Sequence, residues 1–405
     1  MAAMIELIQG GSVTSARGFL AGGTYAGLKT QEDDTLDLGV LVSEHPAGVA
    51  ATFSTNKVLS PSVVLSRDRA RKGSALGVVA NSGCANCCVG PQGLTDAEEM
   101  AALAASHMGV DAGEMLVAST GMIGVELPMA LIRQNIGNIA ATSDGGHDFA
   151  RAIMTTDTRP KEIAVSLDLD GHKVAVGGAA KGVGMIHPNM ATMLCFMTTD
   201  AAVDPGFLKT SLSQAVDASF NMIDVDGDQS TNDTVLLLAN GAAGGPTITR
   251  ESTSAAAFQE ALTYVSTALA KDLVRDGEGA QRLIEVVVEG AETLSDAKKA
   301  AREISASSLV KAMVHGRDPN WGRIMMALGK SGAKMEESKV DVFINDIHIV
   351  HEGVAIPYFK DAVISAMSVP DVGFRVSLNV GEASATAWGC DLTEEYVTFN
   401  SAYST

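Results

Sequence analysis

A threonine stands at the centre of the stretch of this chain that is best suited to chemistry. Residues 181–194 have the sequence KGVGMIHPNMATML, in which a glycine-rich turn and a proline precede Thr192. A threonine hydroxyl is a weak nucleophile, but cleavage of the preceding peptide bond frees an α-amine on the same residue that can act as its base. That amine titrates at about pH 7.7 to 8, close to neutrality. Cleavage between Ala191 and Thr192 would therefore create a nucleophile, whereas an intact Thr192 would merely begin a buried strand.

Seven segments of the chain, including the one around Thr192, share a pattern with one enzyme family. The other six are 119–124 (STGMIG), 154–158 (MTTDT), 226–228 with 230–234 (DGD and STNDT), 276–280 (DGEGA), 318–323 (DPNWGR) and 400–405 (NSAYST). Together they resemble the ornithine acetyltransferase family, the glutamate N-acetyltransferases of arginine biosynthesis. The motifs occur in the family's order and reach the last residue, so the resemblance covers most of the chain.

The resemblance implies a fold and a self-cleavage. Members of the family have a mixed α/β fold, an αββα sandwich with two subdomains, and the strand that carries Thr192 would lie at the junction of the two. The family cleaves itself at an Ala-Thr bond. In this chain that implies an α chain of residues 1–191 and a β chain of residues 192–405. The two fragments would stay assembled, as a heterotetramer of two α and two β chains.

The resemblance also implies a reaction and the residues that perform it. The family transfers the acetyl group of N2-acetylornithine to glutamate by a ping-pong mechanism, with the acetyl group carried on the nucleophile, here Thr192. By motif, Thr120 and Gly121 would hold the oxyanion. The implied substrate contacts are Thr155, Lys181, Thr192, Glu278, Asn400 and Thr405. No cofactor is implied, and acetyl-CoA stays open as a further acetyl donor.

The residue types at these positions suit such roles. Acyl transfer passes through an oxyanion, and a threonine hydroxyl beside a glycine N–H supplies two donors in a compact turn. A lysine such as Lys181 suits a substrate carboxylate, and a glutamate such as Glu278 suits an amine.

The glycines next to Lys181 would let a small anion approach the backbone. Gly182 follows the lysine where a P-loop requires Ser or Thr, so a phosphate-binding P-loop is excluded. The plainer interpretations are an ordinary turn at Thr120 and a solvated lysine at position 181.

Three positions depart from the family's usual pattern. Gln281 and Arg282 follow the DGEGA motif where threonine and lysine are common, and Gln229 stands where threonine is expected. These departures leave the nucleophile unchanged and bear on substrate preference. Two other functions stay open: a self-processed amidohydrolase or aminopeptidase, in which water is the acceptor, and a non-catalytic assembly protein with the same fold.

Composition limits the class of protein. A chain of 405 residues with 46% hydrophobic residues is long enough for two packed subdomains. A formal net charge of -19 disfavours nucleic acid and anionic membranes as partners, because both require basic surface. We find no apolar run long enough for a membrane span and no secretory or transit pattern in the first twenty residues, so a cytoplasmic location is expected.

No metal site is expected. The C-x-x-C-C cluster of Cys84, Cys87 and Cys88 lacks a second half, and small residues that fill a tight turn after a strand are the favoured interpretation. Asp224, Asp226 and Asp228 alternate as in a calcium loop, but Gln229 occupies the position that requires glycine. These carboxylates are expected to satisfy a turn through hydrogen bonds to the backbone. His187 is expected to be structural, because an α-amine base needs no histidine.

Hydrophobic periodicity and turn signals predict the elements that position these residues. The predicted strands are 75–80, 115–118, 161–168, 172–176, 193–197, 234–238 and 285–288, with a hairpin at Asp170-Gly171 and a second hairpin over 340–350. The predicted helices are 95–107 behind a capping box, one beginning near Pro128, 205–218, 254–274 and 296–314. Strands and helices alternate without a dinucleotide-binding pattern, which favours mixed sheets covered by helices.

Overall fold

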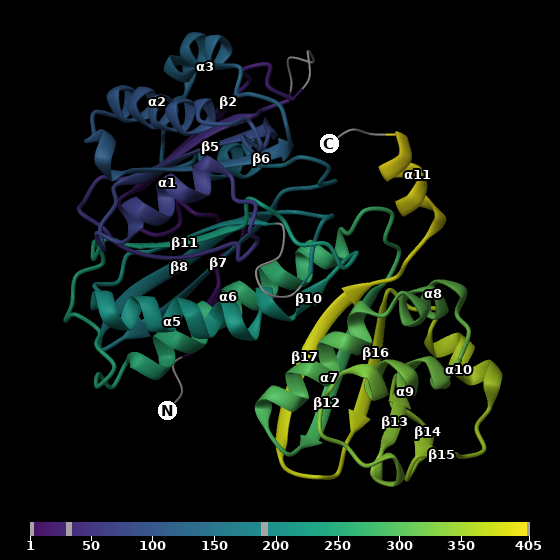
Figure 1. Cartoon of the computed structure of the whole chain (residues 1–405). Helices are drawn as coiled ribbons and strands as arrows, with labels where there is room; N and C mark the ends of the chain where they lie inside the picture. Colours follow the sequence, from purple (N-terminus) through teal and green to yellow (C-terminus); the bar gives the residue numbers. More distant parts are fainter. Residues whose placement is uncertain (1–3, 30–34, 188–192, 403–405) are drawn as a thin grey trace.

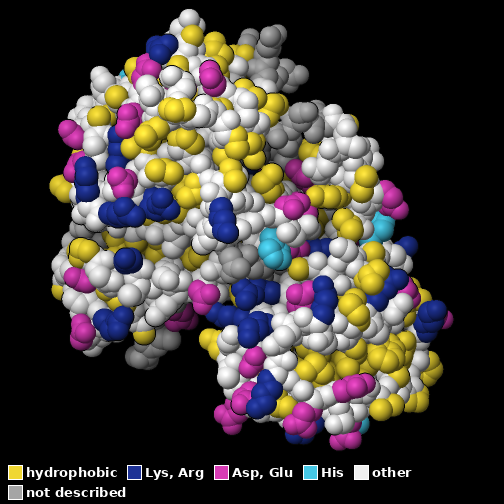
Figure 2. Space-filling view, viewed as in Figure 1, with side chains coloured by type: hydrophobic (Ala, Val, Ile, Leu, Met, Phe, Trp, Pro, Cys, Tyr) yellow, Lys and Arg dark blue, Asp and Glu magenta, His cyan; other side chains and the backbone are white. Residues whose placement is uncertain are grey.

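The computed structural model describes residues 4–29, 35–187 and 193–402. In this part of the chain, two β-sheets lie face to face with helices on their outer sides, and a third sheet with its own helices forms a smaller lobe (Figure 1). The two facing sheets and their helices are the αββα sandwich that the sequence predicts, so the fold class is confirmed. Figure 2 shows that an indentation separates the smaller lobe from the sandwich on one side.

The first sheet of the sandwich has four strands in the order β2-β3-β5-β6. These are β2 (Phe19–Thr24), β3 (Leu38–Ser43), β5 (Gly77–Cys84) and β6 (Met115–Met122), covered by α1 (Pro61–Ala70), α2 (Gln92–Met108) and α3 (Met129–Asn135). Alternate side chains serve two cores, because Val78 and Leu116 face the second sheet whereas Val79 and Val117 face the helices. Strands buried on both faces are nearly continuous apolar runs, as observed here.

The second sheet has six strands in the order β1-β7-β8-β9-β11-β4. These are β1 (Glu6–Leu7), β4 (Gly48–Phe53), β7 (Lys161–Leu169), β8 (His172–Lys181), β9 (Leu194–Thr199) and β11 (Thr234–Ala239), and their outer face packs on α5 (Pro205–Ala218) and α6 (Ala255–Arg275). Between the sheets, Phe196 of β9 meets Phe149 of α4 (Gly146–Ala152) edge to face, with ring centroids 5.1 Å apart. No described helix is long and apolar enough to cross a membrane.

The β7–β8 hairpin brings two lysines to the same end of this sheet. Asp170 and Gly171 both have positive φ, +54° and +83°, which a two-residue type I′ turn requires and which confirms the predicted hairpin. Its register pairs Lys161 with Ala180, so Lys161 lies next to the end of β8 at Lys181. Lys181 in turn pairs with Leu194, the first residue of β9.

The smaller lobe contains seven strands in the order β10-β17-β12-β16-β13-β14-β15. These are β10 (Ile223–Asp224), β12 (Leu283–Ala291), β13 (Asp341–Ile344), β14 (Ile347–His351), β15 (Val354–Ala355), β16 (Asp371–Ser377) and β17 (Ala383–Cys390). Its helices are α7 (Leu294–Ala306), α8 (Ser308–Gly316), α9 (Trp321–Lys330) and α10 (Lys360–Ala366). After β17 the chain returns to the sandwich as α11 (Glu394–Ala402), which Figure 1 shows above the smaller lobe.

Two helix predictions are wrong in detail. The capping box at 95–98 does not form, because α2 begins one turn earlier, behind Pro91, without a side-chain cap. The single helix expected over 296–314 is two helices, α7 and α8, because Ser307 adopts an extended conformation between them. The strands β2, β3 and β4 have no counterpart in the sequence prediction.

Candidate active site

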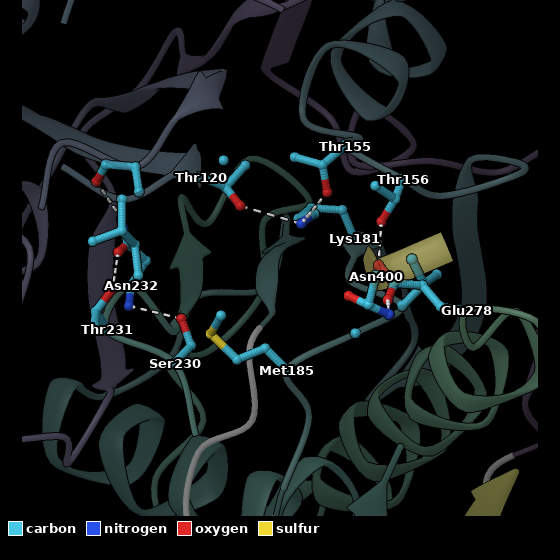
Figure 3. A pocket seen from close by; sticks show the side chains of 15 residues that line it. Thr120, Thr155, Thr156, Lys181, Met185, Ser230, Thr231, Asn232, Glu278 and Asn400 are labelled. Carbon is cyan, nitrogen blue, oxygen red and sulfur yellow. Dashed lines mark hydrogen bonds between the residues drawn. The ribbon is translucent and has the colours of Figure 1, made fainter. Parts of the chain in front are cut away.

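One pocket gathers residues from both layers of strands and from the C-terminal helix (Figure 3). It is an open pocket with about 610 Å³ of empty space, which includes solvent at its mouth. All six predicted site residues that the structure describes line it: Thr120, Gly121, Thr155, Lys181, Glu278 and Asn400. Ala191, Thr192 and Thr405 lie outside the described residues. Residues from position 120 to position 400 thus meet in one cavity.

Lys181 forms the cationic wall of the pocket. It is 3% exposed, and its ammonium donates to Thr155 Oγ1 at 2.8 Å and to Thr120 Oγ1 at 3.2 Å (Figure 3). Burial lowers the pKa of Lys181, and Asp157 opposes this shift. A hydroxyl that accepts a hydrogen bond keeps its own proton for donation. Thr120 and Thr155 can therefore each donate towards a bound ligand, and the ammonium polarises both hydroxyls.

Thr120 and Gly121 are still within β6 and not in the turn that the sequence predicts, because β6 continues to Met122. Parallel pairing with β5 sets Gly121 beside Gly83. Gly121 has φ +126°, and a Cβ added to it would lie 2.3 Å from the carbonyl carbon of Gly83, so no other residue fits. Asn232 fixes the same strand end, since its amide donates to the carbonyl of Ser119 at 2.7 Å.

Removal of the Thr120 hydroxyl is expected to slow turnover. If this group donates to a developing oxyanion, Thr120→Ala should reduce kcat by about 10²- to 10³-fold, with a much smaller change in KM. Thr120→Ser retains the oxygen and is the matched control. Steady-state kinetics on both variants measure the difference, and a raised KM with unchanged kcat in Thr120→Ala would assign this hydroxyl to substrate binding instead.

Glu278 forms the anionic wall. Thr156 Oγ1 donates to Glu278 Oε1 at 2.9 Å, and the Asn400 amide of α11 donates to Oε2 at 2.8 Å (Figure 3). The carboxylate packs against Gly184, where an added Cβ would lie 2.6 Å from Oε2. The Gly182 N–H donates to Asp157 Oδ1 at 2.9 Å. These two glycines therefore accommodate carboxylates of the protein itself, which differs from the predicted approach of a substrate anion.

A buried ion network lies behind the pocket and links its two walls. Lys161 is fully buried, and its ammonium lies 2.6 Å from both Asp157 Oδ1 and Asp276 Oδ2. Burial acts to raise the pKa of Asp157, but Lys181 and Lys161 outweigh it, so that the net pKa is lowered. Asp157 also contacts the chain next to Lys181, and Asp276 lies two residues before Glu278. Lys161 therefore holds together the segments that carry both walls.

Carboxylates also anchor the chain on both sides of segment 188–192. Asp226 accepts from the backbone N–H of Met185 at 2.6 Å and of Ile186 at 3.0 Å. Asp233 accepts from the Met193 N–H at 3.1 Å, and complete burial raises the pKa of Asp233 well above its ordinary value. The alternating acidic residues thus accept hydrogen bonds from backbone N–H groups, as expected. Asp226 accepts from the N–H of Asp228 in its own turn and also from the distant segment at Met185 and Ile186.

The remaining candidates lie apart from the pocket. His187 Nδ1 lies 2.8 Å from the buried Asp224 Oδ2 and does not line the cavity, in agreement with a structural role. Cys84 ends β5, Cys87 is buried and Cys88 is exposed, and the chain turns there with positive φ at Cys88. The cysteine cluster therefore fills a turn after a strand, as predicted.

Sequence reasoning assigned no catalytic or substrate-binding role to several residues that line the pocket. These are Ala85, Ile123, Thr156, Val183, Met185, Ser230, Thr231 and Asn232. Thr156 and the 230–232 segment belong to quoted motifs, so a signal was present in the sequence. The roles of Thr156 and Asn232 could not be assigned because partners such as Glu278 and Ser119 are more than a hundred residues away in the chain.

Comparison with known proteins identifies the family. A model of the ArgJ family matches residues 20–405. "Arginine biosynthesis bifunctional protein ArgJ" of Symbiobacterium thermophilum is 50% identical over 98% of this chain and 99% of its own length, and its Dehalococcoides mccartyi namesake is 46% identical over the whole of both chains. The crystal structure of a protein with this name from Bacillus halodurans is 40% identical with a TM-score of 0.51, covering 51% of this chain and 98% of the solved chain. The chain therefore belongs to the ArgJ family, a family of enzymes, as its sequence motifs predict.

Proposed function

We propose that this enzyme transfers the acetyl group of N2-acetylornithine to glutamate in arginine biosynthesis. The observation that carries the proposal is the pocket with Lys181 on one wall and Glu278 on the other. Ornithine and glutamate each bear a carboxylate and an amine, which these two charges complement. Family membership and the names of the relatives support the same pathway.

In the first half-reaction, Thr192 Oγ attacks the acetyl carbonyl of N2-acetylornithine while its own α-amine takes the hydroxyl proton. The Thr120 hydroxyl and the Gly121 N–H stabilise the oxyanion of the tetrahedral intermediate. Collapse breaks the amide C–N bond, and the proton returns to the departing ornithine nitrogen. In the second half, the amine of glutamate attacks the acetyl ester and Thr192 is regenerated. No cofactor takes part.

The nucleophile is made by cleavage into residues 1–191 and 192–405, which stay together as a heterotetramer of two α and two β chains. Two observations support a cleaved chain with its nucleophile at the pocket. Leu194 pairs with Lys181, and two residues of chain span at most about 7 Å, so a chain that starts at Thr192 would begin close to the pocket. The matched Bacillus halodurans chain is about half as long as this one.

We further propose that acetyl-CoA is a second acetyl donor. Both curated relatives carry the word "bifunctional" in their names, and acylation of Thr192 by a thioester would need the same nucleophile and oxyanion donors. Release of free CoA from acetyl-CoA in the presence of glutamate would demonstrate this activity. The absence of CoA release in an enzyme that is active with N2-acetylornithine would restrict it to the first donor.

The decisive experiment is to trap the acetyl-enzyme. After brief exposure to N2-acetylornithine without glutamate, mass spectrometry should find one acetyl group on the fragment that begins at Thr192, and initial-rate plots should be parallel. Intersecting plots with no acetylated fragment would instead indicate direct transfer. Rapid hydrolysis without transfer to glutamate would make the protein an amidohydrolase, and an intact chain that never acylates would make it a non-catalytic assembly protein.

Glu278→Gln is expected to weaken substrate binding through loss of the charge that an amine prefers. A hydrogen bond to a charged group contributes about 1.5 to 3 kcal/mol, so KM for N2-acetylornithine should rise by about 10- to 100-fold. Glu382→Gln changes an exposed glutamate elsewhere in the chain and serves as the control. An unchanged KM in Glu278→Gln would remove Glu278 from the substrate contacts.

A further inference from the structure

A second group of chemically competent side chains lies on the β13–β14 hairpin of the smaller lobe. Asp341 is the first residue of β13, and His348 and His351 belong to β14. One ligand atom from each residue falls within 4.8 Å of the others. None of the three lines the pocket of the sandwich. The proposed acetyl transfer therefore gives these residues no role.

A β-bulge aims both histidines in the same direction. Residues three apart in a regular strand face opposite sides of the sheet. Here Val342 pairs with Val350 and Phe343 with His348, so that β14 contains one residue more than β13 at this point. The extra residue places His348 on the side of Phe343 and His351 on the side of Asp341, which is the same face. Bulges commonly re-aim a side chain towards a site.

An ordinary histidine–carboxylate pair does not account for this group. His351 Nδ1 alone satisfies such a pair, since it lies 2.8 Å from Asp341 Oδ1. His348 Nε2 lies 3.7 Å from the same oxygen, too far for a hydrogen bond, and it is buried with no hydrogen-bond partner among the residues that the structure describes. The ring of His348 stacks on Phe343 with centroids 4.2 Å apart, which holds this nitrogen in position.

We propose that Asp341, His348 and His351 bind one Zn²⁺ ion on the outer face of this hairpin. Two imidazoles and one carboxylate form a common protein donor set for zinc, with the fourth position left to water. Ligand atoms about 2.0 to 2.1 Å from a tetrahedral Zn²⁺ are about 3.3 Å apart. The measured separations of 2.8 Å and 3.7 Å lie on either side of that distance. Side-chain rotations that bring the three ligand atoms, now within 4.8 Å of one another, to that spacing would complete the site.

The surroundings support a bound cation. Asp341 Oδ2 accepts from the Asn379 amide at 3.0 Å, and the Glu352 N–H donates to Oδ1 at 3.0 Å, which orients the carboxylate. The nearby cation Arg375 is paired with Glu289 at 3.0 Å, which offsets its repulsion of a metal.

Zinc titration of the full protein tests the proposal. After treatment with a chelator and its removal, isothermal titration with ZnCl₂ should saturate at one Zn²⁺ per 405 residues, and the thermal midpoint should rise with added Zn²⁺. His348→Gln and His351→Gln should each weaken binding by at least about 100-fold, since even the partners of metal ligands are worth about 10- to 100-fold. His45→Gln, at an exposed histidine of the sandwich, should bind as the wild type does.

Co²⁺ provides a readout that does not depend on folding stability. Tetrahedral Co²⁺ bound to two imidazoles and a carboxylate absorbs visible light, and this absorption should vanish in both histidine variants. Wild-type protein that fails to bind Zn²⁺ would overturn the proposal. Undiminished one-to-one binding in the double variant H348Q/H351Q would overturn it equally. The proposal would also fail if the variants had lowered thermal midpoints while added Zn²⁺ left the thermal midpoint of the wild type unchanged.

Discussion

Thr192→Ala should yield a single uncleaved chain with no measurable transfer activity. The hydroxyl is needed twice: it attacks the carbonyl of Ala191 in the N-to-O shift that starts cleavage, and later it carries the acetyl group. Loss of a covalent nucleophile in another acyl-transfer enzyme reduces kcat by about 10⁶-fold, and an effect of that order is expected here. Mass spectrometry of the denatured protein measures cleavage directly, since wild type should yield fragments 1–191 and 192–405.

Thr192→Ser is the matched control, because it retains a hydroxyl on the same residue. It should still cleave, although more slowly, and should retain measurable transfer. Circular dichroism and thermal unfolding of both variants would establish that the αββα sandwich still forms. Efficient cleavage of the alanine variant at the same bond would contradict the proposed nucleophile, and cleavage at another bond would move the nucleophile to another residue.

Periodicity and turn chemistry predicted much of the fold, because they act over short distances. The β7–β8 hairpin follows from Asp170-Gly171, which tolerate positive φ, and α5 spans the predicted residues from Pro205 to Ala218. The strands β2 and β4 were missed because the sequences FLAGGT and GVAATF are short and rich in glycine and alanine. Such strands depend on pairing with neighbours across the sheet and not on their own pattern.

The composition of the site was predictable, whereas its interactions were not. The resemblance named Thr120, Lys181 and Glu278, and these residues line one pocket. The sequence did not predict that the Lys181 ammonium bonds two threonine hydroxyls, because those contacts depend on the register of β8 and on the packing of one sheet over the other. The α-amine of Thr192 lies outside the described residues, so its role rests on the resemblance and on chain connectivity.

The acidic surface and the pocket have different electrostatic roles. The formal charge of -19 favours solubility and carries no specificity. Within the pocket, by contrast, Lys181 is fixed by hydroxyl groups and by the charge of Asp157 behind it. Low-dielectric surroundings strengthen such interactions. Substrate recognition should therefore respond to the buried charges near Lys181 and little to substitutions on the surface.

Lys161→Met should unfold much more easily than the wild type. Lys161 is fully buried between two carboxylates at 2.6 Å, and its removal leaves Asp276 without this cation and Asp157 with only the charge of Lys181 nearby. Breaking a buried ion pair in this way typically costs about 3 to 5 kcal/mol. Urea denaturation should show this loss in the free energy of unfolding. Lys173→Met, at a lysine that is largely exposed, should change stability by less than about 0.5 kcal/mol.

The double variant Lys161→Met/Asp276→Asn distinguishes two causes of lost stability. One is loss of the attraction between Lys161 and its carboxylates, and the other is the cost of a buried carboxylate without a cation. If the penalty comes from unpaired buried carboxylates, neutralising Asp276 should recover part of the lost stability. Catalysis should respond in a different way, because Lys161 contacts Asp157, which accepts from the backbone next to Lys181, and Asp276, which lies two residues before Glu278. Both walls of the pocket would then loosen, so KM for both substrates should rise in the single and the double variant alike. If the double variant recovered both stability and the wild-type KM, Lys161 would have a role in folding only. If Lys161→Met were as stable as the wild type, the ion network would not be needed for stability.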